Sequence, residues 1–162
     1  MRKGRSAISA QVTALVRAAL SGPGGPVNDP LARSFLGIPL RLLVPVLRTP
    51  VASAPFIRDA MGHVGGRTCF FDERICEGIS QGTRQIVILG AGFDTRALRL
   101  ASPGVRFIEV DHPSTQEHKR AALARAGVSN PAVLLPLDFE TDDLVSALRG
   151  IGFETDRPCF FL

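Results

Sequence analysis

The sequence has no tryptophan or tyrosine and only three cysteines among its 162 residues. These cysteines, Cys69, Cys76 and Cys159, form no CxxC pair and no zinc-type spacing with histidine. The pattern therefore predicts no metal site, and an odd number of cysteines excludes full disulfide pairing. We expect reduced, buried thiols, as is typical of cytoplasmic proteins.

Long apolar runs and blocks of like charge are also missing. The most apolar stretch, residues 35–47, is interrupted by Pro39, Arg41 and Pro45, far short of the ~20 residues of a membrane-spanning helix. The net charge is only +4, and no basic run suggests nucleic-acid binding. With 45% hydrophobic and 21% charged residues, the chain is predicted to be a soluble globular protein that binds neither nucleic acid nor membrane.

The chain changes character near residue 80. Up to that point, apolar spacing and proline-broken segments predict a helical N-terminal cap over residues 1–80, with helices at 6–20, 56–62 and 68–80. From residue 81, short apolar runs alternate with helical patterns. The predicted strands are residues 85–89, 105–110, 132–137 and 158–162, and the predicted helices between them are 95–100, 115–126 and 142–149.

This alternation predicts an α/β fold with a Rossmann-like parallel sheet and helices on both faces over residues 81–162. The last predicted strand ends with the chain, which would leave an open sheet edge and an uncovered face. We therefore expect the domain to be incomplete at its C-terminus and the chain to be about half of a longer protein.

A glycine-rich turn, Gly90-Ala91-Gly92, follows the first strand and precedes a helix. Such turns let the backbone approach a nucleotide closely. The next strand contains Glu109 and ends at Asp111, and the third strand ends at Asp138. Acidic residues at these strand ends can accept hydrogen bonds from ribose hydroxyls. We prefer Asp111 to Glu109 because it stands at the end of its strand.

The nucleotide is predicted from charge. Thr95 occupies the third glycine position of a dinucleotide motif, and Asp94 precedes it. A carboxylate beside a pyrophosphate would cost on the order of several kcal/mol, whereas a cationic ligand would benefit. The pattern therefore favours S-adenosylmethionine over NAD. Asp94 would assist the ligand's ammonium or cap the following helix; Arg67 would bind its carboxylate or be a solvated residue.

Three segments resemble a known family: residues 67–72 (RTCFFD), 85–96 (QIVILGAGFDTR) and 107–113 (FIEVDHP). They are similar to the leucine carboxyl methyltransferase family, and more closely to its bacterial branch of S-adenosyl-L-methionine-dependent methyltransferases. The resemblance runs through nearly the whole chain but covers only the first half or so of a typical member. It implies that Arg67 holds the methionine carboxylate and that the other cofactor-binding residues are Gly90, Gly92, Asp111, Asp138 and Phe139.

The implied reaction is methyl transfer from S-adenosylmethionine to an oxygen of a small or carboxylate-bearing acceptor, either a carboxylate or a hydroxyl. No catalytic residue is predicted, and the three histidines are expected to be non-catalytic. We expect Arg96 to be a surface or ion-pairing residue and Lys119 to lie on an exposed helix face. Two alternatives stay open: a truncated, non-catalytic fragment that binds cofactor weakly or acts as an interaction module, and an NAD-dependent oxidoreductase.

Overall fold

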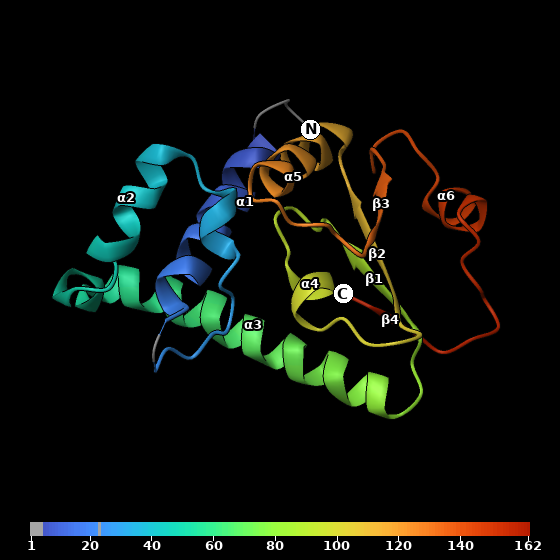
Figure 1. Cartoon of the computed structure of the whole chain (residues 1–162), viewed down its shortest axis with the longest axis horizontal. Helices are drawn as coiled ribbons and strands as arrows, with labels where there is room; N and C mark the ends of the chain where they lie inside the picture. The colour runs from blue at the N-terminus through green and yellow to red at the C-terminus, as the bar shows by residue number, and fades with distance from the viewer. Residues whose placement is uncertain (1–4, 23) are drawn as a thin grey trace.

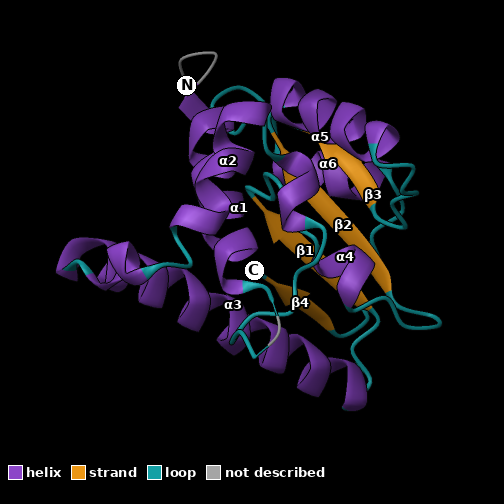
Figure 2. Cartoon of the chain, turned by 60° about the vertical axis from the view of Figure 1, so that its left-hand side comes forward, coloured by secondary structure: helices purple, strands orange, loops and turns teal. Residues whose placement is uncertain are grey.

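The computed structural model describes residues 5–22 and 24–162. Its centre is one parallel sheet of four strands, β1 (Gln85–Leu89), β2 (Arg106–Asp111), β3 (Val133–Pro136) and β4 (Cys159–Phe161). The strand order is β3-β2-β1-β4, which places β3 and β4 at the two edges (Figure 2). The predicted α/β fold with a Rossmann-like parallel sheet is therefore confirmed.

Helices cover both faces of the sheet (Figure 1). On one face, Ile75 of α3 (Pro55–Ser80) and Ala97 of α4 (Arg96–Arg99) pack against Ile86, Ile88 and Phe107 of the strands. Because side chains alternate along a strand, the intervening residues face the other way.

On the opposite face, Leu148 of α6 (Leu144–Gly150) packs against Val87, Ile108 and Val110. The fifth helix, α5 (Pro113–Arg125), returns to the first face. At the β4 edge, Phe161 is 46% exposed. Among the described residues, β4 pairs with β1 alone.

The segment before β1 is helical, with α1 (Arg5–Leu20), α2 (Ile38–Val46), α3 and two short 3-10 helices, Ala32–Phe35 and Pro50–Ser53. The sequence predicted two helices where α3 runs without interruption for 26 residues. Gly65 explains the difference: a Cβ there would lie 2.9 Å from Leu20 Cδ1. This glycine therefore permits α3 to pack closely on α1, and that packing outweighs its poor helix propensity of about 1 kcal/mol.

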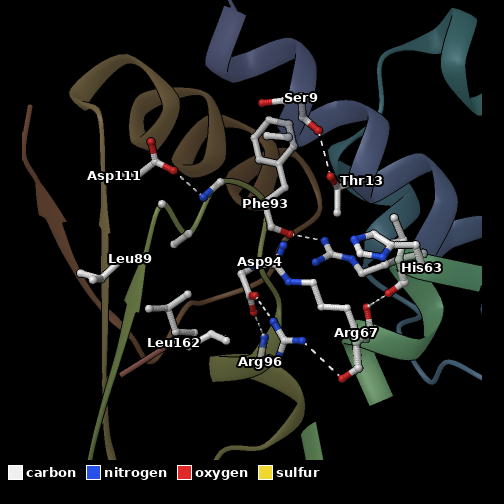
Figure 3. A pocket seen from close by; sticks show the side chains of 18 residues that line it. Ser9, Thr13, His63, Arg67, Leu89, Phe93, Asp94, Arg96, Asp111 and Leu162 are labelled. Atoms are coloured by element: carbon white, nitrogen blue, oxygen red, sulfur yellow. Dashed lines mark hydrogen bonds and ion pairs between the residues drawn. The ribbon is translucent and has the colours of Figure 1, made fainter. Parts of the chain in front are cut away.

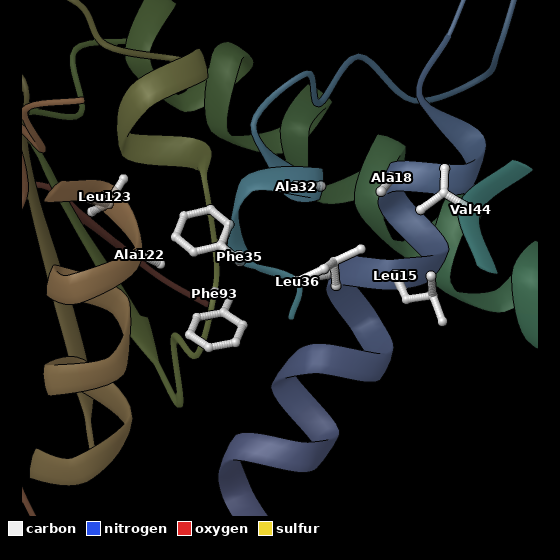
Figure 4. Close-up of a cluster of buried hydrophobic side chains, with 10 residues drawn as sticks. Leu15, Ala18, Ala32, Phe35, Leu36, Val44, Phe93, Ala122 and Leu123 are labelled. Atoms are coloured by element: carbon white, nitrogen blue, oxygen red, sulfur yellow. The ribbon is translucent and has the colours of Figure 1, made fainter. Parts of the chain in front are cut away.

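The helical segment and the sheet share a hydrophobic core (Figure 4). Phe35 stacks on Phe93, which lies just after β1, with ring centroids 5.1 Å apart. Leu15 of α1 and Leu123 of α5 belong to the same cluster. Residues 1–4 and 23 of the predicted cap lie outside the described residues.

The three cysteines are free, but the expectation that they are buried was wrong for two of them. Cys76 and Cys159 are exposed, and Cys69 is half-buried. Among the described helices, none combines the length and the apolar composition that crossing a membrane requires.

Candidate functional site

A cleft of about 630 Å³ lies at the carboxyl end of β1, between the sheet and helices α1 and α3 (Figure 3). Parallel sheets commonly bind ligands at this end of their strands. The cleft is lined by five of the predicted site residues, namely Arg67, Gly90, Gly92, Asp94 and Asp111. Residues from both halves of the sequence therefore contribute to one cavity.

The glycine turn forms the floor of the cleft. Gly90 and Gly92 have φ values of 63° and 51°, a left-handed conformation that side-chain-bearing residues rarely adopt. A Cβ at Gly92 would also lie 3.1 Å from the Cβ of Ala10 on α1. Glycine at this position thus satisfies both the turn and the close approach of the N-terminal helix.

Asp111 is attached directly to this turn. Its Oδ2 accepts a hydrogen bond from the backbone N–H of Gly92 at 2.5 Å, and its Oδ1 accepts one from the N–H of His112 at 2.6 Å. The carboxylate is 7% exposed and lines the cleft. Its position between the end of β2 and the glycine turn is suited to accepting further hydrogen bonds from a ligand.

Glu109 lies on the same face of β2 but deeper, beneath α5. It is 1% exposed and forms an ion pair with Lys119, which is also 1% exposed. The prediction that Lys119 lies on an exposed face was wrong. Its ammonium reaches the sheet and also donates to the backbone carbonyl of Asp94 at 2.6 Å. Burial raises the pKa of Glu109, although the nearby Lys119 charge acts in the opposite direction.

Asp94 has its charge compensated within the protein. Its Oδ1 accepts the backbone N–H of Arg96 at 2.7 Å at the start of α4, and its Oδ2 pairs with the Arg96 guanidinium. Burial raises the pKa of Asp94, but the charges of Arg96, Arg17 and Lys119 outweigh burial and bring the pKa below its ordinary value.

This pairing corrects the electrostatic part of the sequence argument. Asp94 meets the helix start as a capping residue would, and it is not an unpaired carboxylate facing a ligand. Its charge alone therefore does not discriminate between a cationic ligand and a pyrophosphate. Arg96 is an ion-pairing residue, but a buried one rather than a surface one.

A second cluster of buried charges joins the N-terminal segment to the loop after β1. Asp29 Oδ1 accepts the backbone N–H of Ala32, at the start of the short 3-10 helix, at 3.0 Å. Its Oδ2 accepts the Thr95 hydroxyl at 2.7 Å and lies 3.1 Å from Arg17 Nε. The Arg17 guanidinium also donates to the backbone carbonyl of Phe93. This cluster therefore clamps α1 onto the cleft.

Sequence reasoning missed Arg17 as a cleft residue. The available signal was a lone arginine between the buried Val16 and Ala18 of an amphipathic helix. A buried guanidinium requires a partner, but the sequence did not show that the partner is Asp29.

The outer side of the cleft, here called the helical wall, consists of Ser9 and Thr13 of α1 with His63 and Arg67 of α3. The members of each pair are one helical turn apart, so both face the cavity. In Figure 3, His63 and Arg67 lie across the cleft from Asp111. Arg67 sits 5.6 Å from the centre of the Phe71 ring and forms no ion pair with any described residue.

Asp138 and Phe139 do not line this cleft. Asp138 Oδ2 lies 3.7 Å from His112 Nε2, and Phe139 is 51% exposed in the loop after β3. Their predicted contact with adenine stays a prediction. No group of three potential metal-ligating residues occurs within the described ranges.

Comparison with known proteins gives consistent matches. The family model for leucine carboxyl methyltransferase matches residues 10–162. A protein of Mycobacterium tuberculosis (strain ATCC 25618 / H37Rv), named "Putative S-adenosyl-L-methionine-dependent methyltransferase Rv3767c", is 35% identical over 169 aligned positions, covering 92% of this chain and 52% of the relative.

A similarly named protein of Mycobacterium ulcerans (strain Agy99) is 42% identical over 98 residues, covering 59% of this chain and 32% of the relative. The chain thus spans about half or less of the length of these curated relatives. The family match extends over nearly all of the sequence, from the cap through the glycine turn to β4. The chain therefore belongs to the leucine carboxyl methyltransferase family.

Proposed function

We propose that this chain binds S-adenosyl-L-methionine and acts in the transfer of its methyl group to an oxygen of a carboxylate or hydroxyl acceptor. The observation that carries the proposal is the arrangement of opposite charges in the cleft. An anchored carboxylate, Asp111, adjoins the glycine turn, and a guanidinium without an ion-pair partner among the described residues, Arg67, lies across from it.

These groups match the two ends of the proposed ligand. Asp111 would accept hydrogen bonds from the ribose hydroxyls, and Gly90 and Gly92 would allow the methionine part to approach the backbone. Arg67 would bind the methionine carboxylate through two parallel hydrogen bonds. The cleft volume of about 630 Å³ falls within the usual range for small-molecule sites, roughly 300–1,000 Å³.

The remaining predicted residues have supporting or peripheral places. Asp94 would act by holding the start of α4 through Arg96, since its own charge is compensated. Adenine would extend from Asp111 past the end of β2 toward Asp138 and Phe139, which follow the neighbouring strand β3. This placement requires the exposed loop after β3 to contact the ligand.

When bound, S-adenosylmethionine supplies a methyl group that is reactive toward an acceptor oxygen. The protein's contribution would be to align the two reactants and to exclude water. The family membership and the names of the relatives support this function. We also infer a cytoplasmic location, because all three cysteines are free.

Isothermal titration calorimetry tests the proposal with S-adenosylhomocysteine, S-adenosylmethionine and NAD. We expect binding of the first two and no comparable binding of NAD. Preference for NAD would support the oxidoreductase alternative. Absence of all binding would reject the cofactor assignment and favour a non-catalytic fragment.

Arg67→Met, with Arg74→Met as its matched control, tests whether Arg67 binds the methionine carboxylate of the ligand. Both arginines lie on α3 over a phenylalanine ring, at 5.6 Å and 5.8 Å from the ring centres, but only Arg67 lines the cleft. Loss of a charge-assisted hydrogen bond, about 1.5–3 kcal/mol, should weaken S-adenosylhomocysteine binding about 10- to 150-fold in Arg67→Met. Equal affinities of the two variants would refute the role of Arg67.

A further inference from the structure

The helical wall carries a histidine that the proposed cofactor contacts leave unused. His63 lies one turn before Arg67 on α3, is exposed, and lines the cleft. It makes no hydrogen bond or ion pair with another described residue. The sequence favoured a non-catalytic role for His63, because the histidines share no helical spacing with acidic residues that would build a metal site.

We propose that the part of the helical wall around Thr13 and His63 is the acceptor side of the cleft, that the acceptor is a small, mainly apolar alcohol or phenol, and that His63 is its general base. This inference rests on the proposed function, since it assigns the cofactor to the glycine turn, Asp111 and Arg67.

Charge accounts for the choice of a hydroxyl over a carboxylate. Three arginines line the cleft. Arg17 is paired with Asp29, and Arg96 is paired with Asp94 and Asp72. The third, Arg67, is assigned to the methionine carboxylate. An acceptor carboxylate would therefore meet no uncommitted guanidinium in the described cleft, and desolvating it without one is costly.

The rest of the lining suits an acceptor of this kind. Ala10, Val64, Leu89 and Leu162 present apolar surface to the cavity. Thr13 donates its hydroxyl to the backbone carbonyl of Ser9 at 3.0 Å, which leaves its oxygen able to accept a hydrogen bond. Apart from its charged residues, the cleft lining is thus apolar with a few neutral polar groups, as is usual in pockets for small organic molecules.

A hydroxyl acceptor requires a base, whereas a carboxylate acceptor is already deprotonated at neutral pH. Imidazole is the side chain that most often takes this proton. As the acceptor oxygen forms its bond to the methyl carbon, the carbon–sulfur bond breaks and its electron pair returns to sulfur. The hydroxyl proton passes to a ring nitrogen of His63 and then to solvent, which reaches this exposed residue.

The test uses a matched pair of probes, p-cresol and p-toluate, with S-adenosylmethionine labelled in its methyl group. We expect label in the methyl ether of p-cresol and not in an ester of p-toluate. His63→Gln should lower kcat for p-cresol by roughly 10²- to 10⁴-fold, with S-adenosylhomocysteine affinity unchanged. It should also abolish the rise in rate with pH that a titrating base produces. His118→Gln is the control, since His118 is exposed on α5 outside the cleft.

Methylation of p-toluate in preference to p-cresol, or full activity of His63→Gln, would overturn the inference. So would failure to methylate either probe by a protein that binds S-adenosylhomocysteine. Binding is followed separately by NMR, through the His63 ring resonance that is missing in His63→Gln. Addition of p-cresol to the S-adenosylhomocysteine complex should shift this resonance more than p-toluate does, and the reverse order would also refute the assignment. If the wild-type chain does not bind S-adenosylhomocysteine, the proposed function itself is rejected.

Discussion

The two sides of the cleft use charge differently. On the sheet side, Asp94, Arg96 and Asp111 are nearly buried, and each carboxylate already accepts hydrogen bonds from the protein. On the helical wall, His63 and Arg67 are exposed and have no ion-pair partner among the described residues. A buried charge must be paired because it has lost its hydration. An exposed charge is solvated by water and needs no protein partner before a ligand binds.

This contrast separates two kinds of contribution. The buried charges hold the backbone of the glycine turn and the start of α4 in place, so changing them should affect stability. On the helical wall, His63 and Arg67 have no ion-pair partner among the described residues, so changing them should affect ligand binding or turnover more than stability.

The largest expected effect is on the sheet side, at Lys119. Lys119→Met leaves the buried Glu109 carboxylate without its partner, which should lower the free energy of unfolding by about 3–5 kcal/mol. Urea denaturation measures this loss. Glu109→Gln/Lys119→Met should recover part of it, because no unpaired charge is then buried.

The loss of unfolding free energy in Lys119→Met should also depend on pH. Burial already raises the pKa of Glu109, and removal of Lys119 raises it further. A raised pKa means that the folded state loses stability as pH rises through it. The variant should therefore be closer to wild type at pH 5 than at pH 8, and a pH-independent difference would contradict the assignment.

A smaller effect is expected for Asp94→Asn, which removes the ion pair but keeps an acceptor for the backbone N–H of Arg96. We expect a loss of about 1–3 kcal/mol at pH 7. Because the pKa of Asp94 is lowered in the folded state, its contribution is present above the unfolded-state pKa of about 3.9 and is lost as pH falls through the folded-state value. The difference between wild type and variant should shrink below about pH 4; urea denaturation at pH 7 and pH 3 tests this.

Asp111 belongs to both categories, since it anchors the turn and faces the cleft. Asp111→Asn replaces one accepting carboxylate oxygen by an NH2 group, which donates and cannot accept. We expect S-adenosylhomocysteine affinity to fall about tenfold, the value of one hydrogen bond of about 1.4 kcal/mol. Asp138→Asn provides the comparison, because Asp138 does not line the cleft. If calorimetry shows that Asp138→Asn weakens S-adenosylhomocysteine binding more than Asp111→Asn does, Asp111 is not the main carboxylate of the site.

The smallest effect is expected on the helical wall. Thr13→Val removes an exposed hydroxyl that donates to the backbone carbonyl of Ser9 on its own helix. Its free energy of unfolding should stay within about 0.5 kcal/mol of wild type, and S-adenosylhomocysteine affinity should be unchanged. If Thr13→Val lowers the free energy of unfolding as much as Asp94→Asn does, the two sides of the cleft do not differ in their contribution to stability.

The fold was largely predictable where local pattern and tertiary structure agree. The four strands follow short apolar runs, and α1 follows its helical apolar spacing. The uninterrupted α3 was not predicted, because glycine weakens a helix locally and only the contact of Gly65 with Leu20 shows why it is tolerated. Similarly, nothing in the polar face of α5 indicated that Lys119 reaches a buried carboxylate.

The sequence by itself determined the parallel α/β sheet and the meeting of Gly90, Gly92 and Asp111, because the carboxyl ends of parallel strands share one edge. Only the tertiary structure decided which charges are neutralised by partners within the protein. Packing pairs Asp94 with Arg96, and Asp29 with Arg17. It also brought His63 and Arg67 across from that edge. The physical reason is that the hydrogen bonds between paired parallel strands bring their carboxyl ends to one edge, whereas the partner of a charge depends on how distant helices pack.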